Sequence, residues 1–256
     1  MDMTILVTGG TGTLGKLVLP QLKAAGYDVR VLSRRGGVSG DGVEHVQGDL
    51  LKGEGIALDG VDIVVHLAGG AKGDALAAEN LARAAAAAGV GHLVHISVIG
   101  ADKMPIGYFR EKSGAEKAVR ESGVPWTILR AAQFNSLTYA VAQKMGGLPI
   151  VPAPGGLRFQ PVDERDVADR IVELALGEPA GAVPDLAGPT VYDLRELVDG
   201  YLHAQGKRRP KLPIRLPGKV GRAYRNADNL TLTGATIGKH TWEDYLVLRA
   251  AGDPKP

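Results

Sequence analysis

The sequence predicts an α/β protein with a doubly wound parallel sheet and a small C-terminal lobe. Short apolar, β-branched segments alternate with helical patterns along the first 130 residues, and this alternation is typical of parallel sheets. The first of these strands opens directly into a glycine-rich turn and then a helix. At 256 residues, with 45% hydrophobic and 23% charged residues, the chain is long enough for one domain with an appended lobe.

Composition excludes several classes of function. The chain contains no cysteine, so disulfides and thiolate chemistry are absent. Its formal net charge of +2 gives no overall attraction to nucleic acid or membrane. The longest apolar stretch, 81–101, contains Arg83, His92 and His95, which is unlike a membrane span. No pair of the six histidines has convincing metal-ligand spacing. Because no signal peptide precedes the first strand, we expect a cytoplasmic protein that binds neither metal, nucleic acid nor membrane.

The first strand and the turn after it predict a site for phosphates. The strand covers residues 3–8, and the helix after the turn places Leu14, Leu17, Val18 and Leu22 on one face. Gly9 permits the tight turn, Gly12 lets a pyrophosphate approach the backbone, and Gly15 allows close packing of helix on strand. The helix N-terminus also offers free N–H groups. The candidate cofactor contacts here are Gly9, Thr11, Gly12, Thr13, Leu14 and Gly15.

The end of the second strand, 28–33, bears on the choice of cofactor. An acidic residue at this point would hydrogen-bond the adenosine ribose of NAD. Here the chain has Ser33, Arg34 and Arg35, which suit the 2′-phosphate of NADP. The alternative is a solvated basic pair at a strand end. The third strand, 42–48, stops at Asp49 and Leu50.

Small residues follow the fourth strand, which covers 61–68. Ala68, Gly69 and Gly70 would let a cofactor lie flat across the carboxyl end of that strand, where open α/β sheets bind their ligands. The next elements are a helix over 75–89, a strand over 92–98, a loop over 99–107, a helix over 108–122 and a strand over 126–130.

The helix over 108–122 carries an inward stripe of Tyr108, Lys112, Ala115 and Val119. Two of these four residues are small and apolar, so the stripe faces the protein. A lysine on such a face either extends to solvent or has a specific task. Ser97, at the end of the preceding strand, would lie at the same edge of the sheet.

Together these motifs resemble the short-chain dehydrogenase/reductase superfamily, and more narrowly its extended, atypical NmrA-like branch. The resemblance rests on Thr8-Gly9-Gly10-Thr11-Gly12-x-x-Gly15 and on Tyr108-x-x-x-Lys112 after Ser97. It covers the whole chain, although the specific motifs all fall before residue 170. The stretch between Ser97 and Tyr108 is short beside the standard enzymes, and many NmrA-like proteins lose one member of this triad.

The resemblance implies a Rossmann-type fold, NADP(H) as cofactor and a role for each residue of the triad. Lys112 would stabilise the phenolate of Tyr108, lowering its pKa, and would hydrogen-bond the nicotinamide ribose. Tyr108 would be the general acid in carbonyl reduction, and Ser97 would hold the substrate oxygen. Asp49 and Leu50 would lie near the adenine.

Beyond residue 130 we expect a substrate lobe over 131–256, attached to a dinucleotide-binding core over 1–130, with about 163–188 returning to the core. Met104, Ile106 and Phe134, with the apolar loop at 148–157, predict an uncharged, partly hydrophobic substrate pocket. The basic cluster at 207–211 is typical of a solvated loop. Other predicted elements are a strand at 158–162, a helix at 163–176, a strand at 183–187, a helix at 192–206, an extended segment at 212–216 and a helix at 242–250.

The leading functional hypothesis is an NADP(H)-dependent oxidoreductase that reduces a small carbonyl, imine or quinone-like compound. The alternative is an NADP-binding sensor or interaction protein without catalysis. A sugar-nucleotide epimerase is disfavoured because the lobe is small. Ser97, Tyr108 and Lys112 together favour the enzyme, because a sensor needs no general acid. The substrate and the oligomeric state stay open.

Overall fold

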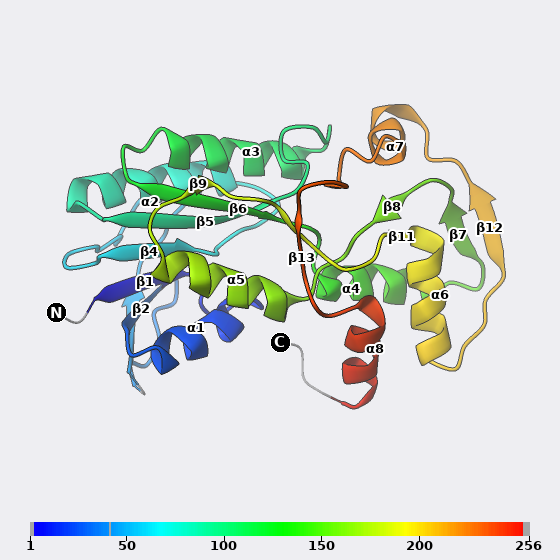
Figure 1. Ribbon diagram of the computed structural model, residues 1–256, viewed down its shortest axis with the longest axis horizontal. Helices are drawn as coiled ribbons and strands as arrows, with labels where there is room; N and C mark the ends of the chain where they lie inside the picture. The colour runs from blue at the N-terminus through cyan, green and yellow to red at the C-terminus, as the bar shows by residue number, and fades with distance from the viewer. Residues whose placement is uncertain (1–2, 41, 253–256) are drawn as a thin grey trace.

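The computed structural model describes residues 3–40 and 42–252 and confirms the doubly wound parallel sheet (Figure 1). Within these residues the central sheet has nine strands, in the order β13-β10-β6-β5-β4-β1-β2-β3, with β9 also paired to β6. The order reverses between β1 and β4, and the neighbouring strands run parallel. The strands are β1 Thr4–Thr8, β2 Asp28–Ser33, β3 Val43–Gln47, β4 Ile63–His66, β5 His92–Val98, β6 Trp126–Ala131, β9 Gly181–Ala182, β10 Leu186–Ala187 and β13 Thr236–Ile237.

Two pairs of helices cover the two faces of this sheet (Figure 1). Helices α1, Gly15–Ala24, and α5, Glu164–Leu176, lie on one face. Helices α2, Asp74–Ala88, and α3, Gly107–Arg120, lie on the other. Successive side chains of a strand point to opposite faces of the sheet, so Ile5 and Val7 pack against α1 and α5, and Leu6 packs against α2 and α3. Both faces of the sheet are therefore buried, which explains the continuous apolar runs in the strands.

The remaining elements gather beyond the carboxyl ends of the strands (Figure 1). Their core contains a cluster of aromatic rings, in which Tyr139 contacts Tyr201, Trp242 and Tyr245, and Trp242 stacks on Tyr245. It holds together helices α4, Asn135–Gly146, α6, Leu194–Ala204, and α8, Trp242–Ala250. Helix α7, Gly218–Arg225, and the short strand pairs β7 Val151–Pro154 with β12 Lys211–Ile214, and β8 Arg158–Phe159 with β11 Tyr192–Asp193, complete this part of the chain.

Several local expectations are wrong. The segment 148–156 was expected to be a loop, but β7 lies within it and pairs with β12, because a two-stranded edge ribbon tolerates proline. Of the strand expected at 183–187 only the last two residues form one, β10, whereas β9 lies just before the expected range. Helix α6 begins at Leu194, two residues later than expected, since a capping box between Asp193 and Glu196 sets its start. Helices α4 and α7 were not predicted. No helix among the described residues has the length and apolarity needed to cross a membrane.

Candidate active site

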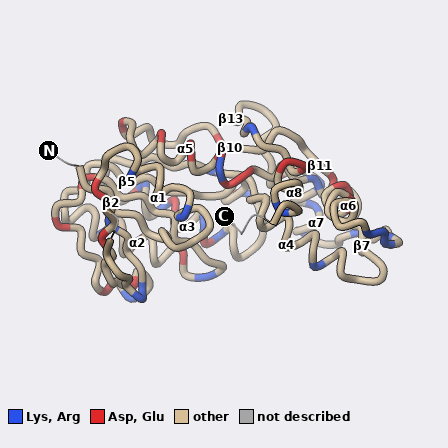
Figure 2. Tube along the Cα trace, turned by 90° about the horizontal axis from the view of Figure 1, so that it is seen from below, with Lys and Arg blue, Asp and Glu red and all other residues tan. Residues whose placement is uncertain are grey.

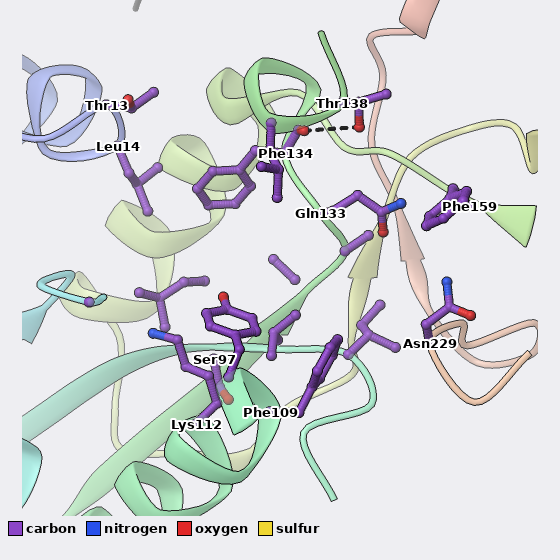
Figure 3. Close-up of a pocket in the computed structure, with 18 of the residues that line it drawn as sticks. Thr13, Leu14, Ser97, Phe109, Lys112, Gln133, Phe134, Thr138, Phe159 and Asn229 are labelled. Carbon is purple, nitrogen blue, oxygen red and sulfur yellow. Dashed lines mark hydrogen bonds between the residues drawn. The ribbon is translucent and has the colours of Figure 1, made fainter. Parts of the chain in front are cut away.

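A cavity of about 720 Å³ lies between the carboxyl edge of the sheet and the C-terminal elements (Figure 3). One end is formed by the glycine turn after β1 and by the residues that follow β4. The other end is closed by Phe159 of β8, by α6 and by Tyr224 of α7. Among the described residues that line it, Lys112 alone carries a charge. The cavity therefore combines a backbone-rich, glycine-lined end with an apolar, aromatic end.

The glycine turn leaves no room for side chains. A Cβ on Gly9, whose φ is +71°, would stand 2.6 Å from the Ala68 nitrogen. A Cβ on Gly15 would stand 2.4 Å from the Gly9 carbonyl oxygen. The Gly12 N–H donates to that same carbonyl at 2.9 Å, closing the turn. Helix α1 begins here with no side-chain cap and no acidic residue in its first turn. Its positive dipole end is available to phosphates, so this cradle fits a dinucleotide.

The other predicted cofactor residues lie along the same edge. Ala68, Gly69 and Gly70 follow β4, and the last two are exposed toward the cavity. Arg34 and Arg35 follow β2, and both are exposed. Beside them, the Ser33 hydroxyl donates to the Gly36 carbonyl at 2.9 Å.

The residues after β2 and β3 stand apart from the cavity. Ser33, Arg34, Arg35, Asp49 and Leu50 are not among its lining residues. The Asp49 carboxylate accepts from the Leu51 N–H at 2.9 Å, which shapes the turn after β3. Any contact of these residues with a dinucleotide would be at its adenosine end, outside the cavity.

Of the three residues predicted for the substrate pocket, Ile106 and Phe134 line the cavity. Met104 does not. It is buried behind the wall, packed with Phe109 and Ala223. Phe109, Gln133 and Phe159 line the cavity although the sequence did not single them out (Figure 3). The basic cluster at 207–211 does not line the cavity; it lies beside β7, where Figure 2 shows basic residues, in blue, at the end of the molecule.

Tyr108 and Lys112 both line the cavity, one helical turn apart on α3. The Lys112 Nζ lies 5.9 Å from the centre of the Tyr108 ring. This ammonium also forms a 2.7 Å ion pair with Asp74 Oδ2, and both side chains are buried. Burial and then the negative charge of Asp74 raise the pKa of Tyr108 above its usual value. The expectation that Lys112 lowers the pKa of Tyr108 is therefore not met in this arrangement, and Tyr108 is a neutral phenol.

Ser97 lines the same cavity, but its hydrogen is already committed. The hydroxyl donates to Glu116 Oε1 at 2.6 Å. Glu116 is 1% exposed and also accepts two hydrogen bonds from Arg130, at 2.7 and 2.8 Å, and one from Arg120 at 3.0 Å. The Ser97 oxygen can still accept a hydrogen bond from a ligand, whereas the role of donor to a substrate oxygen would require this bond to break.

Asp74 and Glu116 are the functional candidates that sequence reasoning missed. Glu116 stands four residues after Lys112, so it falls on the same inward side of α3, and an acid there was a usable signal. Asp74 gave no such signal, because the first turn of a helix is an ordinary place for an aspartate. Its approach to Lys112 depends on how α2 packs against α3.

Two histidines lie beneath Lys112, on adjacent strands. The rings of His66 and His95 stack with centroids 5.0 Å apart, and His66 Nδ1 is hydrogen-bonded to Thr8 Oγ1 at 2.7 Å. Burial, and then the positive charge of Lys112, lower the pKa of His66 to about 3. Burial also holds the pKa of His95 well below its usual value. Both rings are therefore neutral and add no positive charge to the site. His92, by contrast, pairs with Thr127 Oγ1 at 2.8 Å.

Comparison with known proteins agrees with this geometry. A family model described as NAD(P)H-binding matches residues 9–177. A (4-alkanoyl-5-oxo-2,5-dihydrofuran-3-yl)methyl phosphate reductase of Streptomyces griseus is 35% identical, over 90% of this chain and 88% of its own. An NAD(P)H azoreductase of Xenophilus azovorans is 33% identical, over 68% and 64%. The NADPH-dependent quinone oxidoreductase of Escherichia coli, complexed with NADPH, superposes with a TM-score of 0.77 at 20% identity, covering 95% of this chain and 98% of that one.

Proposed function

We propose a catalytic function for this chain, which belongs to the NAD(P)H-binding family and, within it, to the NmrA-like branch of the short-chain dehydrogenase/reductases. The function is NADPH-dependent reduction of a small, uncharged carbonyl, imine or quinone-like acceptor. One observation carries it: a single cavity joins the glycine cradle to an aromatic pocket, and Tyr108 and Lys112 stand between the two ends. A nicotinamide and an acceptor can meet there.

The cofactor side of the proposal rests on the cradle. Gly9, Gly12 and Gly15 leave their backbone open to a pyrophosphate. The exposed Arg34 and Arg35 offer positive charge to a 2′-phosphate at the end of β2. Bound NADPH would supply the hydride. The ammonium of Lys112, held beside Gly69, would donate hydrogen bonds to the nicotinamide ribose hydroxyls.

The protein supplies the proton and the exclusion of water. Hydride addition to a carbonyl carbon leaves negative charge on the oxygen, which must be protonated. The Tyr108 phenol stays protonated because its pKa is raised, so it serves as the acid, donating from its oxygen to the substrate oxygen. The aromatic and aliphatic walls keep bulk water from the reacting atoms. In this scheme the Ser97 hydroxyl donates its hydrogen to Glu116 and does not donate to the substrate.

The charge of the cavity supports an uncharged substrate. Lys112 alone among the described lining residues is charged, and Asp74 neutralises it. Ile106, Phe109 and Phe134 form apolar walls suited to a flat, conjugated molecule. Among the described lining residues, a phosphate ester, as in the name of the Streptomyces reductase, would find Lys112 as its one charged partner inside the cavity. Quinones, azo compounds and cyclic enones are therefore the first compounds to test.

The test is a screen of these acceptors with NADPH oxidation as the readout. An active acceptor is then used with Tyr108→Phe, which removes the proton donor and keeps the ring. Turnover should fall by about 10²–10⁴, the size of a lost general acid, while the Kd for NADPH changes little. Wild-type turnover by Tyr108→Phe would contradict the assigned role of Tyr108. Tight NADPH binding with no active acceptor would favour the sensor.

A further inference from the structure

Asp74 is the acid that touches Lys112. It is the first residue of α2 and is 6% exposed. One carboxylate oxygen, Oδ2, pairs with Lys112 Nζ at 2.7 Å. The other, Oδ1, accepts from the Gly70 N–H at 2.6 Å. A single buried carboxylate therefore joins the start of α2, the glycine segment after β4 and the lysine of α3.

We propose that Asp74 is the positioning residue of this site, holding the Lys112 ammonium against the glycine segment and cancelling its charge beside Tyr108. The inference rests on the proposed function, because it assigns the Lys112 site to the nicotinamide ribose. Lysine has a long, flexible stem that must be held in place before it can bind a ligand in one geometry. Asp74 provides this hold from a different helix.

The packing around the ammonium supports this role. A Cβ on Gly69 would stand 2.7 Å from Lys112 Nζ, so the ammonium lies directly against the backbone that follows β4. An ammonium has three N–H donors, and ribose hydroxyls at the carboxyl end of the strand would accept from those that face away from the Asp74 ion pair. The Asp74–Gly70 bond holds this backbone and the ammonium to the same carboxylate.

The charged and titratable groups around Tyr108 show what balances the charge of Lys112. Lys112 approaches from the same helix and Asp74 from α2. Beneath Lys112, His66 and His95 on β4 and β5 are neutral. On the lobe side Tyr224 of α7 is a neutral phenol, because burial raises its pKa. Asp74 is thus the group that offsets Lys112, and with it in place Tyr108 keeps its proton.

A double-mutant cycle on NADPH binding tests the positioning role without any need for turnover. Lys112→Gln leaves Asp74 as a buried, unpaired anion facing the cofactor, which costs much more than loss of one contact. We expect Lys112→Gln to weaken NADPH binding more than about tenfold. Adding Asp74→Asn to this variant should recover about tenfold of the loss, the size of coupling between contacting residues. A double variant that binds NADPH as poorly as Lys112→Gln overturns the inference.

The pH profile of kcat supplies a readout that a purely structural ion pair would not move. Asp74→Asn keeps an oxygen for the Gly70 N–H and removes the negative charge that helps raise the pKa of Tyr108. The alkaline limb of kcat should therefore shift to lower pH. The matched control is Glu121→Gln, which removes an exposed acid paired with Lys117 at the C-terminal end of α3 and should leave the limb in place. An unchanged limb in Asp74→Asn overturns the electrostatic role. If the wild-type protein shows no turnover with any acceptor, the proposed function is contradicted, and the NADPH-binding cycle alone decides whether Asp74 positions Lys112.

Discussion

The buried carboxylate of Glu116 yields the sharpest stability prediction. Substituting Glu116→Gln keeps the shape of the side chain and removes its charge. The carboxylate accepts from Ser97, from Arg130 twice and from Arg120, and it joins α3 to the ends of β5 and β6. The amide of glutamine retains one acceptor oxygen but turns an NH₂ group toward donors it cannot satisfy.

The magnitude follows from the exposure of the partners. Removing one member of a fully buried ion pair costs about 3–5 kcal/mol. The Arg130 side chain is 21% exposed and also pairs with Asp102 at 3.0 Å, so the guanidinium keeps a partner and some water. We therefore expect a loss near the lower end, about 3 kcal/mol. For a chain of this size about 2–4 °C of Tm is lost per kcal/mol, so Tm should fall by roughly 6–12 °C.

Thermal and urea unfolding of Glu116→Gln and of Glu121→Gln provide the assay. Glu121, at the C-terminal end of α3, pairs with Lys117 on the protein surface at 4.0 Å, and surface pairs contribute about 0–1 kcal/mol. The buried variant should unfold well before the surface variant. Equal stability of the two would refute the reasoning, because the network would then contribute no more than a neutral hydrogen-bonded cluster.

Three further predictions concern the cofactor, the serine and acid stability. Arg34→Ala should weaken NADPH but not NADH binding by about ten- to a hundredfold, the value of a charge-assisted phosphate contact; equal wild-type affinity for both cofactors would mean that the arginines are only solvated. Ser97→Ala should lower kcat far less than Tyr108→Phe, because the Ser97 hydrogen is donated to Glu116; an equal loss would restore the serine as a donor to substrate. Since the folded pKa of His66 is about 3 against 6.5 when unfolded, the unfolded chain binds the proton first, and the free energy of unfolding should fall by about 1.4 kcal/mol per pH unit from pH 6 to 4. Urea titrations of the wild type and His66→Asn should differ by this slope, and equal slopes would show that His66 is protonated in the folded state.

Local patterns were sufficient for the core of the fold. The strand over 28–33 and the helix over 242–250 were predicted with the bounds that the structure shows. Buried strands in a parallel sheet are apolar on both faces, and glycine punctuates their ends, so each element carries its own signal. The right-handed crossover then leaves few ways to order the strands. The glycine turn was equally predictable from its sequence, although the backbone that crowds Gly9 comes from Ala68, after β4.

Pairings between distant segments were decided only by the tertiary structure. Nothing local marks 151–154 as a strand, because its partner β12 begins sixty residues later, at Lys211. The same holds for charge: Asp74 meets Lys112, and Ser97 meets Glu116, only because helices and strands converge at one edge of the sheet. A sequence shows which groups can ionise or donate, whereas burial and the nearest partner decide which of them do. Tyr108 was therefore predictable as a candidate acid, but its raised pKa was not, because this depends on the burial of the phenol and then on a carboxylate that the packing of α2 against α3 brings beside it.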